Sequence, residues 1–291
     1  MNRRTFLKRF ALGTVGVVGA GDGGYYYAHE IEPSWLKVVE NEIHSIRIPN
    51  GFDGFTIMQL TDTHLGFQYD IEDFEQMINK VNQLQPDLIV FTGDLMDDPS
   101  LNTNKQYASI IERLKKLEAP HGKYWVYGNH DHGGYGTEKI DQVMAAGGFE
   151  LLKNQAISIE KDQQLIHLAG IDDALLGDPQ MQGLIDESQQ GDFNILLAHE
   201  PDYADTVKNY PFDVQLFGHS HGGQIQLPVF GSIITPSLGE KYVEGDFKLG
   251  PRPLQLFVSK GLGTTRLPFR FLCRPEINLY TLRKESTSSS T

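Results

Sequence analysis

The chain has 291 residues, of which 40% are hydrophobic and 22% are charged, as in ordinary globular proteins. Its single cysteine, Cys273, excludes a disulfide framework within the chain and zinc sites built from cysteines. The formal net charge is −13, with +3 in the first 28 residues and −16 in the rest, so the body is a poor partner for nucleic acid and we expect no specific nucleic-acid binding.

The N-terminus has the layout of an export signal, with a basic start, an apolar middle and small residues after it. Residues 2–8 (NRRTFLK) resemble the twin-arginine translocation motif. The apolar stretch 10–20 is shorter than the roughly 20 residues of a membrane span, which excludes a multi-spanning protein. We predict a twin-arginine-type signal or anchor over residues 1–28, which the twin-arginine translocation machinery binds, and a linker over 29–43. A disordered basic terminus is the alternative.

Strands and helices alternate in the first half of the chain. Alternating polarity predicts a half-buried strand over 44–48, and apolar runs predict strands over 55–60, 87–91 and 124–127. Apolar residues at helical spacing predict a helix from the capping Asp70 to about residue 85, and a second helix over 104–118. This alternation favours βαβ units and a mostly parallel sheet, an α/β fold.

Strands dominate the second half after a helix predicted over 137–146. Two strands flank a turn at 161–164, and further strands are predicted over 193–198, 214–217, 224–227, 254–258 and 277–282. No linker composition interrupts this pattern. We therefore predict a single domain over residues 44–284, followed by a disordered tail over 285–291.

Polar residues with metal-binding side chains stand directly after five of the predicted strands. They are Asp62 and His64, Asp94, Asn129 and His130, His199, and His219 and His221. In α/β proteins, bound molecules and ions lie beyond the carboxyl ends of the strands. We therefore expect these side chains to line one common cleft. Alternate residues of an extended segment point the same way, so Asp62 and His64 can hold one ion, and the last two histidines can reach one site or two. So many donors suit two ions better than one.

The sequence blocks that carry these residues resemble, in this order, those of the calcineurin-like metallophosphoesterases. The blocks are Asp62-x-His64, Gly93-Asp94, Gly128-Asn-His-Asp131, His199 and Gly218-His-x-His221. With the twin-arginine start, the chain is similar to an exported bacterial subgroup of that family. The resemblance implies a four-layer α/β/β/α sandwich located at the cell wall or the outer face of the cytoplasmic membrane. It also implies two divalent ions, one held by Asp62, His64, Asp94 and His221, the other by Asp94, Asn129, His199 and His219.

The resemblance further implies hydrolysis of phosphate mono- or diesters by a hydroxide held between the two ions. His130 is then the catalytic residue that faces the leaving group, and Asp131 is available to orient it. Ligands of nitrogen and oxygen alone suit manganese, zinc or iron and do not choose among them. Two alternatives remain. One is a lipid-linked phosphoesterase or pyrophosphatase at the membrane surface. The other is a non-catalytic scaffold on the same fold, which the complete set of ligands disfavours.

Several neighbouring residues have two interpretations. Asp97 either braces a ligand or caps a loop. Residues 258–263 (VSKGLG) either approach the metals through their backbone or form a tight turn. The apolar and basic stretch 266–274 is either a lip that contacts an anionic lipid or polymer, or core packing with solvated arginines, which we favour. Within these segments, Lys260 and Arg266 are the candidate contacts for substrate phosphate.

Overall fold

The computed structural model describes residues 21–132, 137–186, 189–250 and 252–286. The predicted twin-arginine motif and residues 287–291 of the predicted tail lie outside these ranges. Among the described residues, no helix is long and apolar enough to cross a membrane.

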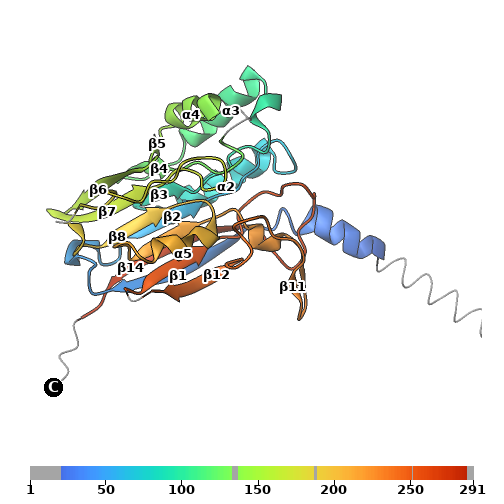
Figure 1. Ribbon diagram of the computed structural model, residues 1–291. Coiled ribbons are helices and arrows are strands. Elements are labelled where there is room, and N and C mark those ends of the chain that lie inside the picture. Colours follow the sequence, from blue (N-terminus) through green and yellow to red (C-terminus); the bar gives the residue numbers. More distant parts are fainter. Residues whose placement is uncertain (1–20, 133–136, 187–188, 251, 287–291) are drawn as a thin grey trace, which may run out of the picture.

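Two six-stranded sheets form the centre of the molecule (Figure 1). The first sheet has the order β1 (Lys37–Ser45), β14 (Glu276–Lys284), β2 (Thr56–Leu60), β3 (Leu88–Phe91), β4 (Lys123–Trp125) and β5 (Glu150–Leu151). The second has the order β12 (Gly245–Leu249), β13 (Leu254–Val258), β9 (Val214–Phe217), β8 (Asn194–Leu197), β7 (Gln164–Gly170) and β6 (Gln155–Lys161). A separate hairpin joins β10 (Gln226–Leu227) to β11 (Gly231–Ser232).

Each sheet has a parallel centre, formed by β2 to β5 in the first and by β7, β8, β9 and β13 in the second. Antiparallel pairs occur where β14 meets β2 and at both edges of the second sheet. All the parallel strands that precede the candidate ligands therefore end on one side of the molecule. The predicted parallel sheet is thus two sheets, and the ligands come from both.

Three hydrophobic cores separate four layers. The helices α2 (Ile71–Leu84), α3 (Asn104–Leu114) and α4 (Thr137–Ala146) pack on the outer face of the first sheet. The second core lies between the sheets and includes Ile57 of β2 and Ile195 of β8. The third core covers the outer face of the second sheet and includes the short helix α5 (Ala204–Val207). Because residues alternate between the faces of a strand, Met58 packs under the helices while Ile57 faces the other sheet. The predicted four-layer α/β fold is confirmed.

The helix boundaries follow from capping. Asp70 accepts N–H groups from Glu72 and Asp73 at 2.9 Å, and Asp73 completes a capping box at the start of α2. Thr103 and Gln106 form a second capping box at the start of α3. The predicted helix 104–118 ends earlier than expected, at Leu114.

The strand predicted over 44–48 is wrong in its bounds, since β1 spans Lys37–Ser45. β1 pairs with β14 along its whole length, and this pairing orders a segment whose own side chains are largely polar and exposed. The second half of the expected linker 29–43 therefore belongs to the first sheet.

The stretch 266–274 does not carry solvated arginines throughout. The guanidinium of Arg270 is fully buried and donates to the carbonyl oxygens of Lys260 (2.8 Å) and Gly263 (2.6 Å). Arg274 stacks on Trp35 at 4.1 Å from the ring centre. The predicted core packing is therefore correct for Arg270, but this arginine is not solvated. Its guanidinium instead binds the backbone of the loop 260–263.

Candidate metal centre

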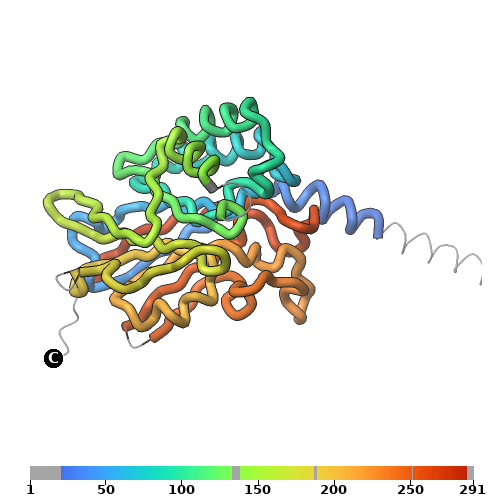
Figure 2. The backbone as a smooth tube through the Cα atoms, turned by 45° about the horizontal axis from the view of Figure 1, so that its top comes forward, coloured from blue at the N-terminus to red at the C-terminus, as the bar shows by residue number. Residues whose placement is uncertain are grey.

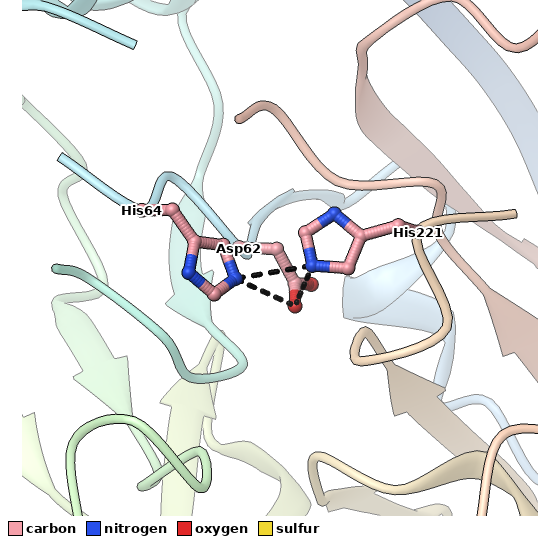
Figure 3. Close-up of side chains that lie close together, drawn as sticks. All are labelled: Asp62, His64 and His221. Atoms are coloured by element: carbon pink, nitrogen blue, oxygen red, sulfur yellow. Dashed lines mark hydrogen bonds and ion pairs between the residues drawn. The ribbon is translucent and has the colours of Figure 1, made fainter. Parts of the chain in front are cut away.

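Three candidate ligands meet at one point where the two sheets face each other (Figure 3). Nε2 of His221 lies 3.4 Å from Oδ1 of Asp62, and Nε2 of His64 lies 4.0 Å from the same oxygen. The two ring nitrogens are 3.0 Å apart. All three side chains are buried, so a pair of imidazole lone pairs and a carboxylate converge in a protected position, as they do around a cation.

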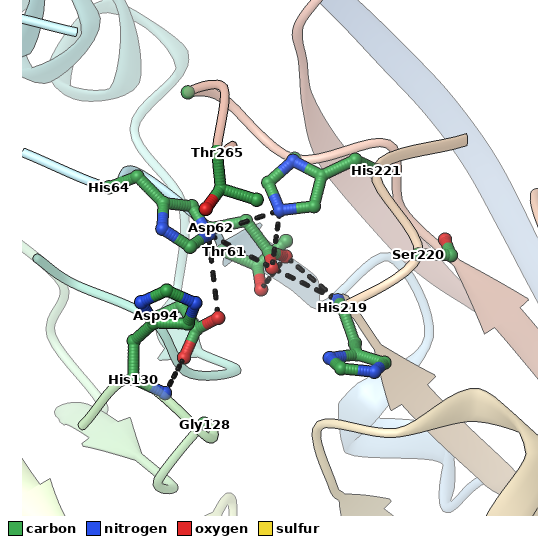
Figure 4. A network of polar contacts seen from close by, with 12 residues as sticks. Thr61, Asp62, His64, Asp94, Gly128, His130, His219, Ser220, His221 and Thr265 are labelled. Carbon is green, nitrogen blue, oxygen red and sulfur yellow. Dashed lines mark hydrogen bonds and ion pairs between the residues drawn. The ribbon is translucent and has the colours of Figure 1, made fainter. Parts of the chain in front are cut away.

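A second group adjoins the first through Asp94 (Figure 4). Oδ2 of Asp94 lies 3.4 Å from Nε2 of His64 and 3.2 Å from Nε2 of His199. The ligand atoms of Asp94, His199 and His219 lie within 4.8 Å of one another. The carboxylate of Asp94 therefore stands between the two groups, where it can bridge two ions. The ligand atoms of His64, Asp94 and His130 also lie within 4.8 Å of one another.

Asn129 provides a direct test of whether a cation fits. Its side-chain oxygen Oδ1 is buried and accepts no hydrogen bond within the described part of the chain. A buried amide oxygen without a partner costs about 1–3 kcal/mol, and a cation would satisfy it. The residue lines the same cleft as Asp94 and His219. The donor set of nitrogen and oxygen atoms fits divalent cations.

In three of the candidate histidine ligands, one ring nitrogen lies within hydrogen-bond distance of an oxygen that does not belong to a candidate ligand. Nδ1 of His64 lies 3.1 Å from Oδ1 of Asp97, and Nδ1 of His199 lies 2.7 Å from the carbonyl oxygen of Thr92. Nε2 of His219 lies 2.8 Å from the carbonyl oxygen of Ser237. Such partners fix the tautomer that leaves the other nitrogen available to a metal. Asp97 therefore braces a ligand, one of the two interpretations of its sequence position.

The backbone at the ligands is not extended, contrary to the expectation from the strand pattern. Five of the seven candidate ligands have positive φ angles. They are Asp62 (52°), His64 (43°), Asp94 (60°), His219 (67°) and His221 (51°). This left-handed conformation costs roughly 1–2 kcal/mol for residues other than glycine, and such strain gathers at functional sites. Asp62 and His64 still converge, while His219 and His221 turn to different groups.

Glycines next to the ligands allow this close approach. A Cβ on Gly218 would overlap Oδ2 of Asp62 and Oγ1 of Thr61. Gly93 has a φ of +100°, and a Cβ there would overlap Nδ1 of His199. Both positions require glycine for physical reasons that the sequence motif alone does not state.

Asp131 has a different role from the one expected. Its buried carboxylate accepts N–H groups from Asp94 (2.6 Å), Leu95 (3.0 Å) and Gly128 (3.1 Å). The ring nitrogen Nδ1 of His130 instead lies 2.6 Å from the carbonyl oxygen of Asp97. The expectation that Asp131 orients His130 is therefore corrected: it fixes the backbone around Asp94, and the Asp97 carbonyl positions the histidine.

At Asp94 and His199, burial and neighbouring charges shift the pKa in opposite directions. Burial disfavours ionisation of Asp94, but His199 and then His130 outweigh it and hold the pKa of Asp94 well below its usual value. Burial alone would lower the pKa of His199, yet Asp94 raises it well above normal. For Asp62, burial is the largest effect and raises the pKa. Burial lowers the pKa of His219 to about 4.

A cleft of about 220 Å³ opens over the centre. Its polar lining includes Gln224, Thr265 and the candidate site residues Asp94, Asn129, His130, His219 and His221. Its apolar lining, which we call the apolar wall, comprises Ile225, Ile233, Ile234, Pro236 and Leu267. Arg266 also lines the cleft, as its candidate role requires. Lys260 does not line this cleft and pairs with Glu244 (3.3 Å) and Glu276 (3.5 Å), so it is removed from the candidate phosphate contacts.

The backbone of the glycine-rich stretch 258–263 contacts the candidate ligand Asp62. The N–H of Gly263 donates to the carbonyl oxygen of Asp62 at 2.7 Å, and a Cβ on Gly261 would overlap Asp62. The loop therefore approaches a candidate ligand through its backbone. Thr265, which sequence analysis missed, donates its hydroxyl to Oδ1 of Asp97 at 2.8 Å, and no motif marks it.

The chain is similar to known proteins over most of its length. A family model described as calcineurin-like phosphoesterase matches residues 55–223. The chain is 46% identical to the metallophosphoesterase YkuE of Bacillus subtilis, over 97% of this chain and 98% of that protein. It is 28% identical to the phosphodiesterase YaeI of Escherichia coli, over 94% and 98%. It is 25% identical to the UDP-2,3-diacylglucosamine pyrophosphatase LpxG of Chlamydia muridarum, over 87% and 91%.

Proposed function

Since the chain belongs to the calcineurin-like phosphoesterase family, we propose that it is a metallophosphoesterase that hydrolyses phosphate mono- or diesters with two divalent cations at the candidate centre. The observation that carries the proposal is the position of Asp94, whose Oδ2 lies within 3.4 Å of a ring nitrogen from each group. Asp62, His64 and His221 hold one cation, and Asn129, His199 and His219 hold the other, with Asp94 shared. Manganese, zinc and iron all suit these ligands.

Bound cations would supply a water of lowered pKa as the nucleophile and would offset charge on the phosphoryl oxygens. The chain itself positions the ester. His130 lines the cleft, and its ring is held by the carbonyl oxygen of Asp97. It is the residue placed to give a proton to the departing oxygen. Arg266 lies in the same cleft and provides a positive charge for a phosphate oxygen.

Metal analysis combined with two substrates tests this proposal. Purified protein should contain about two metal ions per chain, and chelation should abolish turnover that Mn²⁺ or Zn²⁺ restores. Rates on 4-nitrophenyl phosphate and bis(4-nitrophenyl) phosphate separate a monoesterase from a diesterase. Asp94→Asn should reduce both the metal content and the rate. A protein that stays inactive on both esters after metal addition would contradict the proposed activity.

A lipid-linked ester or pyrophosphate is the second candidate substrate. The apolar wall of the cleft favours it, because a nucleotide or sugar phosphate needs polar partners there. The similarity to LpxG, whose name describes a diacylated sugar nucleotide as its substrate, agrees with this candidate.

The proposal includes export by the twin-arginine route, with the enzyme acting at the cell wall or the outer face of the cytoplasmic membrane. The motif at residues 2–8 and the apolar residues 10–20 support it.

A further inference from the structure

Large apolar side chains gather on the hairpin beside the metal centre. Val229 is completely exposed at its tip, Phe230 is 84% exposed, and Ile233 and Ile234 are 56% and 57% exposed. With Leu227, these residues form what we call the apolar rim. Soluble proteins rarely expose so many adjacent large apolar side chains unless the surface binds something.

The apolar rim continues into the cleft. Ile233 and Ile234 belong both to the rim and to the apolar wall of the cleft that Asp94 also lines. The base of the hairpin is fixed, because the N–H of Ile233 donates to the carbonyl oxygen of Ile225 at 3.2 Å. An apolar group that enters the cleft can therefore extend outward along the rim without crossing a polar surface.

The described chain begins next to the rim. Tyr25 packs edge-on against Phe269, and Tyr27 packs edge-on against Phe271. Phe271 is joined to the hairpin, since its carbonyl oxygen accepts the N–H of Gln226 at 2.9 Å. Figure 2 shows this first helical segment, in blue, projecting from the same end of the molecule as the orange hairpin.

The sequence before that segment is suited to the same surface as the rim. Residues 10–20, which directly precede the described chain, are apolar, and residues 3–9 contain four of the basic side chains. Tyr25 and Tyr26 are 61% and 59% exposed, and aromatic rings of this kind favour the interface of a membrane. The exposed Tyr25 and Tyr26 and the apolar rim therefore both suit a membrane interface, and the sequence before residue 21 has the composition for one.

Charge distinguishes this end from the rest of the protein. The whole chain has a net charge of −13, yet no Asp, Glu, Lys or Arg occurs between Asp213 and Glu240. The lining of the cleft beside the rim includes the cationic Arg266 and one acidic residue, the candidate ligand Asp94. An acidic protein that approaches anionic phospholipids needs a contact surface free of carboxylates, and the rim meets this need.

We propose that the apolar rim docks on a phospholipid bilayer, with the side chains of Val229 and Phe230 inserted among the lipids, so that the metal centre acts on a phosphate ester whose apolar chain lies along the cleft wall. The docking is inferred from the exposed side chains of the rim and does not depend on the enzymatic activity. The choice of substrate rests on the proposed phosphoesterase activity. The inserted side chains are outside the cleft lining, so their substitution leaves hydrolysis of a small soluble ester unchanged.

Depth-dependent quenching tests the docking directly. Full-length Phe230→Trp protein is mixed with phosphatidylcholine vesicles containing phosphatidylglycerol and a brominated lipid. The matched control is Ile46→Trp, because Ile46 is 48% exposed just after β1 ends, at the opposite end of the first sheet from the candidate ligands. We expect at least twofold quenching of the added tryptophan in the first variant, and none beyond that of the wild type in the control. Equal quenching in both variants, or none in either, would overturn the proposal.

Two esters with one leaving group test the choice of substrate. These are 4-nitrophenyl methyl phosphate in solution and 4-nitrophenyl hexadecyl phosphate in the same vesicles. Val229→Ser/Phe230→Ser should lower kcat/KM for the hexadecyl ester at least tenfold and leave the methyl ester unchanged. The control pair Ile46→Ser/Leu165→Ser, exposed at the far ends of the sheets, should change neither.

The outcomes separate this inference from the proposed function. No hydrolysis of either diester by metal-loaded wild-type protein would overturn the lipid substrate, and no hydrolysis of 4-nitrophenyl phosphate as well would count against the phosphoesterase proposal. In both cases the quenching result would still decide the docking. Hydrolysis of both esters that Val229→Ser/Phe230→Ser leaves unchanged would overturn the lipid substrate. A dimer that this variant dissociates, without quenching in Phe230→Trp, would overturn docking in favour of a second copy of the chain.

Discussion

Asparagine at position 131 tests how the shared ligand is held in place. The carboxylate of Asp131 is fully buried and accepts N–H groups from Asp94, Leu95 and Gly128. An asparagine has one acceptor oxygen and puts an NH₂ group where the second oxygen stands. At least one of these backbone N–H groups would then face another donor. We expect the Asp131→Asn protein to be less stable and to bind metal more weakly.

The magnitude follows from the geometry. Oδ2 of Asp131 accepts two of the three N–H groups, from Asp94 and Gly128, so the better orientation of asparagine keeps its oxygen there and loses the bond from Leu95. A hydrogen bond to a charged group contributes roughly 1.5–3 kcal/mol, and a buried unpaired donor costs about 1–3 kcal/mol. Because both figures describe the same lost contact, they do not add, and we expect the free energy of unfolding to fall by about 1.5–3 kcal/mol. For a domain of this size, that lowers the Tm by roughly 3–12 °C.

Thermal unfolding and Mn²⁺ titration calorimetry measure the two effects. The matched control is Asp213→Asn, because Asp213 is also buried, accepts the N–H of Asn194 at 2.9 Å and pairs with Arg252 at 2.8 Å, away from the centre. The control should lose stability but keep its metal affinity. Wild-type Tm and Mn²⁺ affinity in Asp131→Asn would refute the reasoning. Loss of turnover alone, limited to poor leaving groups, would instead favour the original assignment of Asp131 to His130.

Three further substitutions test other parts of the interpretation. His130→Ala should lower kcat on an alkyl phosphate by at least about 100-fold and change kcat on an activated aryl phosphate far less, because only the poor leaving group needs a proton; equal losses would remove its role as an acid. Gly218→Ala should cost about 1–3 kcal/mol in unfolding free energy and weaken Mn²⁺ binding, since the new Cβ overlaps Asp62, and unchanged affinity would contradict the crowding argument. Lysine at both Arg3 and Arg4 should leave the protein in the cytoplasm on cell fractionation, and unchanged export would exclude the twin-arginine route.

The candidate ligands could be found from the sequence because their positions are local. Each follows a short apolar run, and the end of a buried strand is the place where a side chain reaches a cleft. Asp94 lies three residues after β3 ends, and His199 lies two residues after β8 ends. The chemistry of the donors then restricted the choice to divalent cations. The helix predicted over 137–146 has the same bounds in the structure, where it is α4 (Thr137–Ala146).

The errors share another physical cause, which is dependence on distant parts of the chain. The sequence of β1 is largely polar, which does not predict a strand. It is a strand because it pairs with β14, which lies more than 200 residues later in the chain. Asp131 was assigned to its neighbour His130 because the two are adjacent in sequence. In a turn, however, adjacent side chains diverge, and the carboxylate reaches the N–H of Asp94 instead. The hairpin of the apolar rim shows no strong strand pattern, and only its exposure beside the cleft gives it meaning.

The strained backbone at the centre is held by contacts that need no cation. The N–H group of Asp94, a ligand with positive φ, is bound by Asp131, and the carbonyl oxygen of Asp62, another such ligand, accepts the N–H of Gly263. Arg270 in turn holds the carbonyl oxygen of Gly263 from the opposite side. Because the polypeptide sets these positions, little binding free energy is needed to order the ligands when a cation arrives. We therefore expect residues outside the candidate ligand set, such as Asp131 and Arg270, to influence metal affinity through the backbone of the candidate ligands.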